Sequence, residues 1–84
     1  MTFEQVEDII KKRNTTATAF QIRFKARNSM KGIFIKSADY NELSRKNLWR
    51  VVSESRMESY MKSHDENLSR IFNGTEFTKL ELIP

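Results

Sequence analysis

Apolar and polar residues alternate most clearly between residues 20 and 27. The apolar positions are Phe20, Ile22, Phe24 and Ala26, and the polar positions are Gln21, Arg23, Lys25 and Arg27. Successive side chains of a strand point to opposite faces, so this pattern predicts a strand with one apolar face and one basic face. Asn28 and Ser29 predict a turn. Residues 30–36 then complete a basic β-hairpin that spans residues 16–36.

Ahead of the hairpin, residues 1–14 predict an N-terminal amphipathic helix. Thr2 and Gln5 have the spacing of a capping box, which predicts that the helix begins at residue 3 and ends near residue 13. The apolar residues that follow the cap fall on one helical stripe: Phe3, Val6, Ile9 and Ile10. We expect this stripe to pack on the sheet.

The remainder, residues 37–84, predicts helices and strands in alternation. In order these are a short helix over 37–46, a strand over 48–52, a short helix over 55–62, a helical segment over 65–74 and a strand over 76–83. Gly74 suggests a left-handed helix stop, and Gly32 suggests a bulge or a close backbone approach. Trp49 is expected to anchor the core or an edge, with a base-stacking surface as the alternative. The terminal strand is expected either to pair with the first strand or to form an edge that dimerises.

This order predicts a single α+β domain over residues 1–84. We expect a four-stranded, mostly antiparallel sheet with an N-terminal helix and short helical insertions. A small SH3-like partial barrel is the alternative. A chain of 84 residues leaves no room for two independent cores.

Composition argues against an enzyme. The chain has no cysteine, which excludes a thiolate metal site and a cysteine nucleophile. Its one histidine, His64, cannot supply a zinc site, and its sequence neighbours Ser63 and Asp65 cannot form a triad with it. Two glycines do not make a phosphate-binding loop. We therefore expect no catalytic residues, no metal and no cofactor.

The longest apolar run is too short for a transmembrane helix, and the first residues do not resemble a signal peptide. We expect no contact with a membrane. The absence of cysteine suits a reducing compartment, so a cytoplasmic location is expected.

Charge gives the best functional signal. The net charge is +4, and residues 14–36 hold five basic residues and no acid. Alternate residues of a strand lie about 7 Å apart on one face, which is close to the spacing of successive phosphates along a nucleic-acid strand. The leading hypothesis is a small non-enzymatic module that binds nucleic acid or another polyanion. Its candidate contact residues are Arg23, Lys25, Arg27, Lys31, Lys36 and Arg50.

Two other interpretations stay open. Lysine and arginine on a strand also discourage edge aggregation, so the basic face could serve solubility alone. The chain could then be a protein-interaction module or an accessory subunit, as a homodimer or with another protein. The amphipathic helix and the terminal strand motivate that second hypothesis. No helix-turn-helix spacing and no aromatic RNA-binding strand supports the first.

Overall fold

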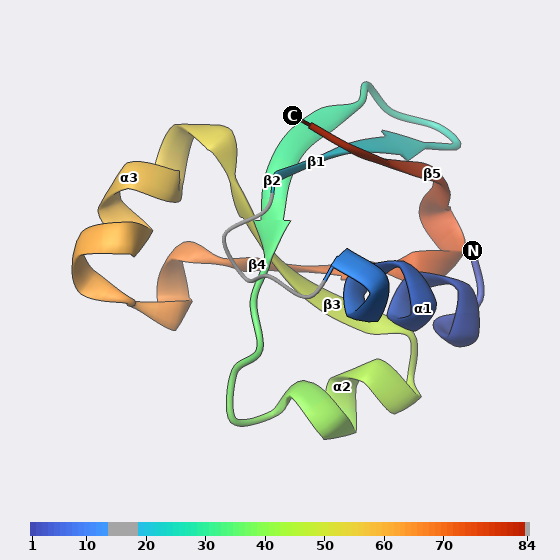
Figure 1. The fold of residues 1–84 in the computed structure, drawn as a ribbon, viewed down its shortest axis with the longest axis horizontal. Coiled ribbons are helices and arrows are strands. Elements are labelled where there is room, and N and C mark those ends of the chain that lie inside the picture. The colour runs from blue at the N-terminus through green and yellow to red at the C-terminus, as the bar shows by residue number, and fades with distance from the viewer. Residues whose placement is uncertain (14–18, 84) are drawn as a thin grey trace.

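The computed structural model describes residues 1–13 and 19–83, and Figure 1 shows its fold. The predicted start of the hairpin, residues 16–18, lies outside the described residues. The elements are α1 (Phe3–Arg13), β1 (Ala19–Phe24), β2 (Met30–Phe34), α2 (Tyr40–Arg45), β3 (Leu48–Ser53), α3 (Glu54–Ser63), the 3-10 turn η1 (Glu66–Leu68), β4 (Arg70–Asn73), the 3-10 turn η2 (Gly74–Glu76) and β5 (Phe77–Leu82). The strands form one antiparallel sheet in the order β4-β3-β2-β1-β5. The α+β class is confirmed.

The sheet has five strands where the sequence predicted four, because residues 65–74 do not form one helical segment. A single helical turn, η1, is followed by β4, which pairs along its whole length with β3. Leu68, Ile71 and Phe72 fit helical spacing, but a run this short does not distinguish a helix from a strand. Pairing with β3, and not local periodicity, therefore makes residues 70–73 a strand.

The hairpin is shorter than predicted. β1 ends at Phe24, and residues 25–29 form the connection to β2. The pairing between β1 and β5 shifts register between Arg23 and Phe24, and beyond that point the Lys25 backbone N–H donates to the carbonyl oxygen of Glu76. The continued alternation through Arg27 predicted a longer strand, but the chain leaves the sheet after this irregularity.

The N-terminal helix has the predicted bounds and the predicted cap. The Thr2 backbone N–H donates to Gln5 Oε1 (2.9 Å), and the Gln5 N–H donates to Thr2 Oγ1 (3.2 Å). These two bonds satisfy donors that a helix start otherwise leaves unpaired. Val6, on the apolar stripe, is fully buried against the sheet.

The sheet is strongly bent. β1 and β4 are separated by two strands, so a flat sheet would hold them about 14 Å apart. Instead the Phe24 and Phe72 rings meet with centroids 5.6 Å apart, and Phe34 of β2 meets Phe77 of β5 at 6.2 Å. In the described residues β4 and β5 do not pair with each other, although η2 joins them. The fold is thus only roughly consistent with the partial-barrel alternative.

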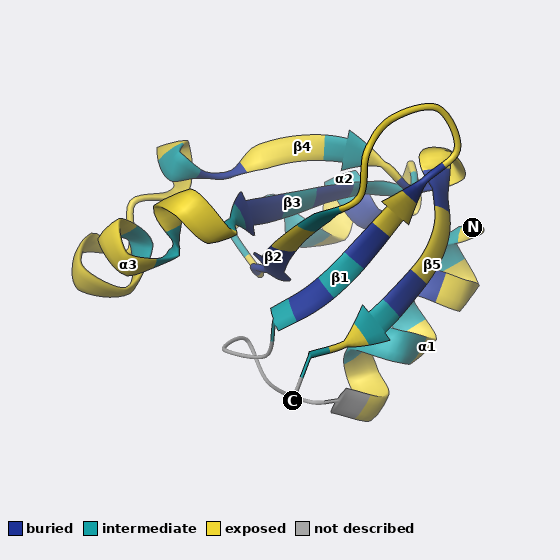
Figure 2. Ribbon diagram, turned by 90° about the horizontal axis from the view of Figure 1, so that it is seen from above, coloured by how far each residue is buried: buried dark blue, intermediate teal, exposed yellow. Residues whose placement is uncertain are grey.

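Both sides of the sheet bury apolar side chains. The inward side holds Val6, Phe20, Ile22, Phe24, Phe34, Trp49, Val51, Phe77 and Leu80. The opposite side holds a smaller cluster of Ile33, Ile35 and Val52, covered by Met57 and Tyr60 of α3. Figure 2 shows the result on β1 as alternating bands of buried and more exposed residues. Trp49 is a core residue, as predicted, and only 2% exposed.

Each of the two glycines has close neighbours that leave no room for a side chain. A Cβ on Gly32 would lie 2.7 Å from Val51 Cγ1 and 2.8 Å from the Val52 carbonyl oxygen, so the predicted close backbone approach is confirmed. The prediction for Gly74 is wrong, because it has no positive φ and begins η2. A Cβ there would strike Asn47, whose carbonyl oxygen accepts the Gly74 N–H (2.7 Å).

Candidate anion-binding pocket

The outer face of the hairpin carries acids among its bases. Arg23 Nε lies 2.7 Å from Glu81 Oε1, and Lys79 Nζ lies 3.9 Å from the other oxygen of the same carboxylate. These contacts, first the hydrogen bond from Arg23, lower the pKa of Glu81. Lys31 Nζ lies 4.0 Å from Glu54 Oε2. The face that looked purely basic along residues 14–36 is therefore of mixed charge, because β5 and α3 contribute acids to it.

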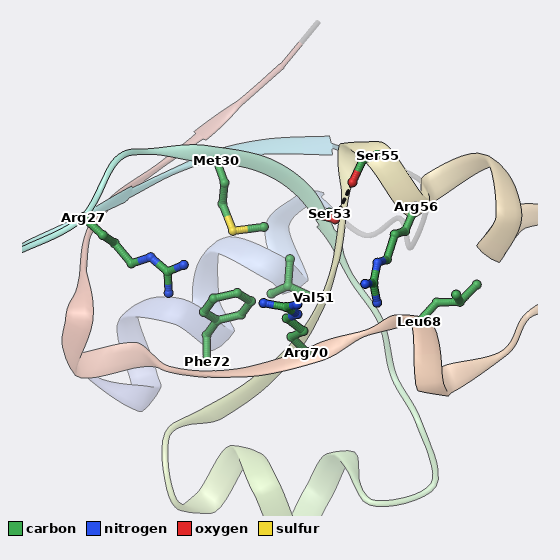
Figure 3. Close-up of a pocket in the computed structure, with 9 residues that line it drawn as sticks. All are labelled: Arg27, Met30, Val51, Ser53, Ser55, Arg56, Leu68, Arg70 and Phe72. Carbon is green, nitrogen blue, oxygen red and sulfur yellow. Dashed lines mark hydrogen bonds between the residues drawn. The ribbon is translucent and has the colours of Figure 1, made fainter.

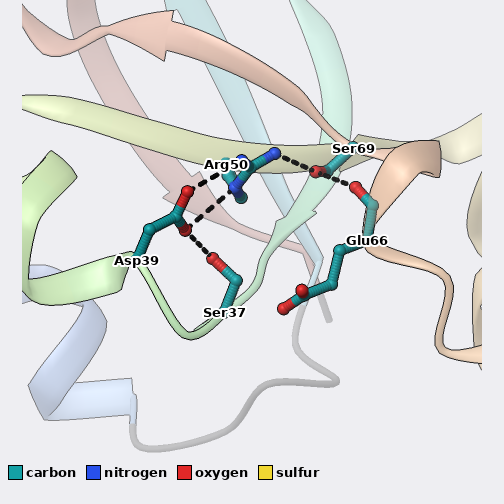
Figure 4. Close-up of polar contacts among 5 residues, drawn as sticks. All are labelled: Ser37, Asp39, Arg50, Glu66 and Ser69. Atoms are coloured by element: carbon teal, nitrogen blue, oxygen red, sulfur yellow. Dashed lines mark hydrogen bonds and ion pairs between the residues drawn. The ribbon is translucent and has the colours of Figure 1, made fainter.

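Arg50 has several of its donors committed to neighbours within the fold, as Figure 4 shows. Its Nη2 and Nε donate to the two Asp39 oxygens (2.8 and 3.1 Å), and its Nη1 donates to Ser69 Oγ (3.3 Å). The Ser69 hydroxyl in turn donates to the Glu66 carbonyl oxygen (2.6 Å). The network joins β3 to the start of α2 and to the residue before β4.

The charges of this network stabilise each other. The pKa of the Asp39 carboxyl is lowered to about 2, first by the hydrogen bond from Arg50 and then by one from Ser37. The same bond to Asp39 is the main cause of a raised pKa for the Arg50 guanidinium. The geometry gives Arg50 a structural role. The smaller apolar cluster, in which Ile33 pairs with Val52, also lies between Arg50 and the basic residues of the hairpin.

The other lysines proposed from the sequence are scattered. Lys25 is exposed in the connection between β1 and β2. Lys36 follows β2 at the end opposite to Met30, and its ammonium group lies 5.4 Å from the centroid of the Tyr40 ring. The six proposed residues therefore do not form one continuous surface.

Arg27, the last of the six, belongs to a different site. It lines a cavity of about 320 Å³ on the inward side of the sheet, together with Arg56 of α3 and Arg70 of β4. Figure 3 shows the three side chains pointing into this cavity from the β1–β2 connection, α3 and β4. The complete lining consists of Arg27, Met30, Val51, Ser53, Ser55, Arg56, Leu68, Arg70 and Phe72. We call it the arginine pocket.

Among the residues that the structure describes, no acid lines the arginine pocket. Within the described residues, no carboxylate oxygen lies within 4.0 Å of the Arg27, Arg56 or Arg70 guanidinium. Three positive charges thus line one concave space, and no acid of the described residues forms an ion pair with them. This is the reverse of the outer hairpin face.

Packing holds Arg27 in the pocket. Its guanidinium carbon lies 5.2 Å from the Phe24 ring centroid and 5.6 Å from the Phe72 ring centroid. A cation is attracted to an aromatic face at such distances, and arginine uses its flat face for the contact. These two contacts hold the Arg27 guanidinium against the Phe24 and Phe72 rings.

The other two arginines are positioned by strand pairing and by the start of a helix. Arg70 pairs with Val51 in the β3–β4 ladder, so its side chain shares the inward side with Val51 and Phe72. Arg56 is in the first turn of α3. Ser53, the N-cap residue, makes no capping bond with its side chain, and its hydroxyl contacts Ser55 Oγ at 3.2 Å. The wall of the pocket therefore presents hydroxyl groups beside the arginines.

Sequence reasoning missed Arg56 and Arg70. Residues 53–84 hold more acids than bases, so a count along the chain assigns this region no basic surface. The predicted helix over 65–74 also hid the strand alternation that directs Arg70 and Phe72 to one side. Only the β3–β4 pairing and the bend of the sheet bring them to Arg27.

Other chemistry has little support in the described residues. No group of three or more potential metal-ligating side chains is present there. His64 is exposed at the end of α3 with a left-handed backbone (φ 54°). Within residues 1–13 and 19–83, no helix is long and apolar enough to span a bilayer.

Comparison with known proteins adds no identification. No family model, no curated protein and no solved structure matches this chain. The functional proposal therefore depends on the geometry of the arginine pocket.

Proposed function

We propose that this protein is a non-enzymatic module that binds nucleic acid, and that the arginine pocket makes its principal phosphate contacts. The observation that carries the proposal is that Arg27, Arg56 and Arg70 line one cavity together, with no acid of the described residues in its lining. Planar guanidinium groups match phosphate oxygens in a fork geometry, which makes arginine the preferred residue for this recognition.

The lining favours nucleic acid over a purely charged polymer. Met30, Leu68 and Phe72 give the arginine pocket a half-buried apolar floor. A sulfated or acidic polymer has little to place there, whereas a nucleotide offers a sugar and a base beside its phosphate. Single-strand binding sites combine positive charge with aromatic and apolar contacts in this way.

The pocket favours a single strand in particular. It lies between the β1–β2 connection and β4 on the inward side of the bent sheet, and its volume of about 320 Å³ suits one unpaired nucleotide. We further propose that the bent sheet is an SH3-like partial barrel with the arginine pocket on its inward side.

The test is fluorescence anisotropy with internally labelled single-stranded RNA and DNA of about ten nucleotides, a length typical of small single-strand sites. We expect binding that weakens steeply as salt is raised from about 50 to about 200 mM, because counterions are released from phosphates. Arg56→Glu with Arg70→Glu should weaken binding by about 30-fold or more, since two phosphate contacts become repulsive.

The control is Arg45→Glu with Lys46→Glu, which makes the same change in net charge at exposed positions outside the pocket lining. We expect it to weaken binding by about threefold or less, the effect of net charge alone. Equal losses for the two double variants would show that the pocket is not the site. Circular dichroism must show that both variants fold.

A protein-interaction module is the second candidate. The edge strands β4 and β5 carry exposed apolar side chains, Ile71 (46% exposed) and Leu82 (40% exposed). An exposed strand edge can pair with another chain, either a second copy or a partner protein. Size-exclusion chromatography with light scattering at high micromolar concentration tests the homodimer. If the chain is strictly monomeric and binds no oligonucleotide, the remaining candidate is a different protein partner. A pull-down experiment would then search for it.

A further inference from the structure

The arginines of the pocket are spread along it. Figure 3 shows them in a row across the cavity, with Arg27 and Arg56 at opposite ends and Arg70 between them. The ring of Phe72 lies in the same row, between Arg27 and Arg70. Separate charges with an aromatic ring among them suit a chain that carries successive charges, and they do not suit a single anionic group.

Phe72 separates two of these charges by about the repeat of a nucleic-acid strand. Arg70 and Phe72 are alternate residues of β4 on the inward side of the sheet, so their Cα atoms lie about 7 Å apart. On the other side of the ring, the Arg27 guanidinium carbon lies 5.6 Å from the Phe72 centroid. Successive phosphates of a strand have a comparable spacing. Arg27 and Arg70 are therefore placed to contact two different phosphates.

The position between these two arginines is apolar and open to the pocket. Phe72 and Met30 pack against the core but are only half-buried. In Figure 3, Met30 points from β2 toward the ring of Phe72 on β4. An aromatic ring and a thioether both make favourable contacts with the flat face of a base. The cavity volume of about 320 Å³ suits one nucleotide, so there is room for one base.

From these observations we propose that Phe72 and Met30 form a single base-binding position between two phosphate contacts, one made by Arg27 and the other by Arg70. The inference rests on the proposed function and specifies how the strand lies in the pocket. One nucleotide packs its base on Phe72, and the phosphates on its two sides meet the two arginines. Arg56, at the far end of the row, contacts the strand beyond Arg70.

The experiment uses the full chain and three unlabelled DNA backbones of about ten units, which compete with a fluorescently labelled single strand. The first backbone has abasic tetrahydrofuran units throughout, the second has one central adenine and the third has two adjacent adenines. All three carry the same charge. We expect the first base to raise affinity at least about fivefold, through stacking. The second base should add about twofold, because it only doubles the number of binding registers.

Phe72→Leu tests the ring itself. We expect the gain from the first base to fall below about twofold, while affinity for the base-free backbone stays within about threefold. Tyr60→Leu is the matched control, since it removes a half-buried ring from the opposite side of the sheet. It should keep the full gain, and an equal loss in both variants would overturn the role of Phe72. The three backbones decide the proposal on the wild-type chain even if a variant does not fold.

Arg27→Gln and Arg70→Gln test whether the two arginines contact separate phosphates. Each change should weaken binding of the base-free backbone by about threefold or more and reduce the slope of log affinity against log salt by about one. In the double variant the two losses should multiply, because independent contacts are additive in free energy. A double variant no weaker than either single variant would show a shared contact and overturn the flanking arrangement.

The outcomes separate this inference from the proposed function. Equal affinity for all three backbones, with all of them bound, would overturn the base-binding position and leave phosphate binding in place. A second base that adds as much as the first would overturn the single position. No binding of any backbone or of the labelled strand at low salt would overturn the inference and the proposed function together.

Discussion

The outer face of the hairpin and the arginine pocket are both basic in sequence, yet they differ as surfaces. On the outer face, Arg23 and Lys31 have Glu81 and Glu54 as neighbours. In the pocket, Arg27, Arg56 and Arg70 have no such neighbours among the described residues. The difference teaches that a count of charges along a strand does not measure the field that a ligand meets, because adjoining strands and helices contribute their own charges.

The largest expected effect comes from neutralising each surface in turn. Arg56→Gln with Arg70→Gln should weaken oligonucleotide binding by about tenfold or more, whereas Arg23→Gln with Lys31→Gln should weaken it by about threefold or less. The two double variants change net charge equally, so anisotropy titrations at one salt concentration compare them directly. A larger loss from the hairpin pair would reverse the comparison and return the site to the outer face.

A smaller effect is expected from removing the acids that balance the hairpin. Glu54→Gln with Glu81→Gln leaves Lys31, Arg23 and Lys79 without these carboxylates. At low salt we expect about a threefold to tenfold gain in affinity, together with a steeper dependence on salt as more phosphates are contacted.

Glu4→Gln with Glu42→Gln is the matched control for that pair, because it removes the same charge from α1 and α2. If both pairs raise affinity equally, net charge explains the gain. The outer face then has no local role.

The smallest expected effect is on the stability of the fold. It concerns Arg50, which belongs neither to the outer face of the hairpin nor to the arginine pocket. Asp39→Asn removes the charged partner of Arg50, and we expect a Tm several degrees lower at neutral pH. Because the pKa of Asp39 is lowered in the fold from 3.8 to about 2, its contribution is present above pH 3.8 and is lost as pH falls toward 2. The difference in Tm between wild type and variant should therefore shrink over that interval.

Circular dichroism melts between neutral pH and pH 2 measure this difference. Oligonucleotide affinity at neutral pH serves as the second measurement. Asp39→Asn should leave it unchanged if the Asp39–Arg50 network is purely structural. A constant difference in Tm across the acid range would show that the ion pair does not stabilise the fold.

Much of the secondary structure could be predicted because its signals are local. Three such signals agree with the structure: the capping box of Thr2 and Gln5, the alternation through Phe20 to Phe24, and the large side chain of Trp49. Prediction failed over residues 65–74, where too few residues carry the pattern. There the hydrogen-bonding edge of β3 decided between helix and strand.

The candidate site was the least predictable part. Arg27 was identified for its place in an apparent strand, but in the structure it lies beyond the end of β1 and stacks on Phe24 and Phe72. Arg56 and Arg70 carried no local signal, since residues 53–84 hold more acids than bases. Their grouping requires a bend that brings β1 and β4 into contact across two intervening strands.

The sequence by itself determined the α+β class, the helix cap, the apolar side of the hairpin strand and an excess of positive charge. These follow from propensities and periodicities that act over a few residues. Only the tertiary structure decided where that charge is left unbalanced. Electrostatic neighbours are set by distance in space, and strand pairing and sheet curvature bring residues 27, 56 and 70 together while they place acids beside residues 23 and 31.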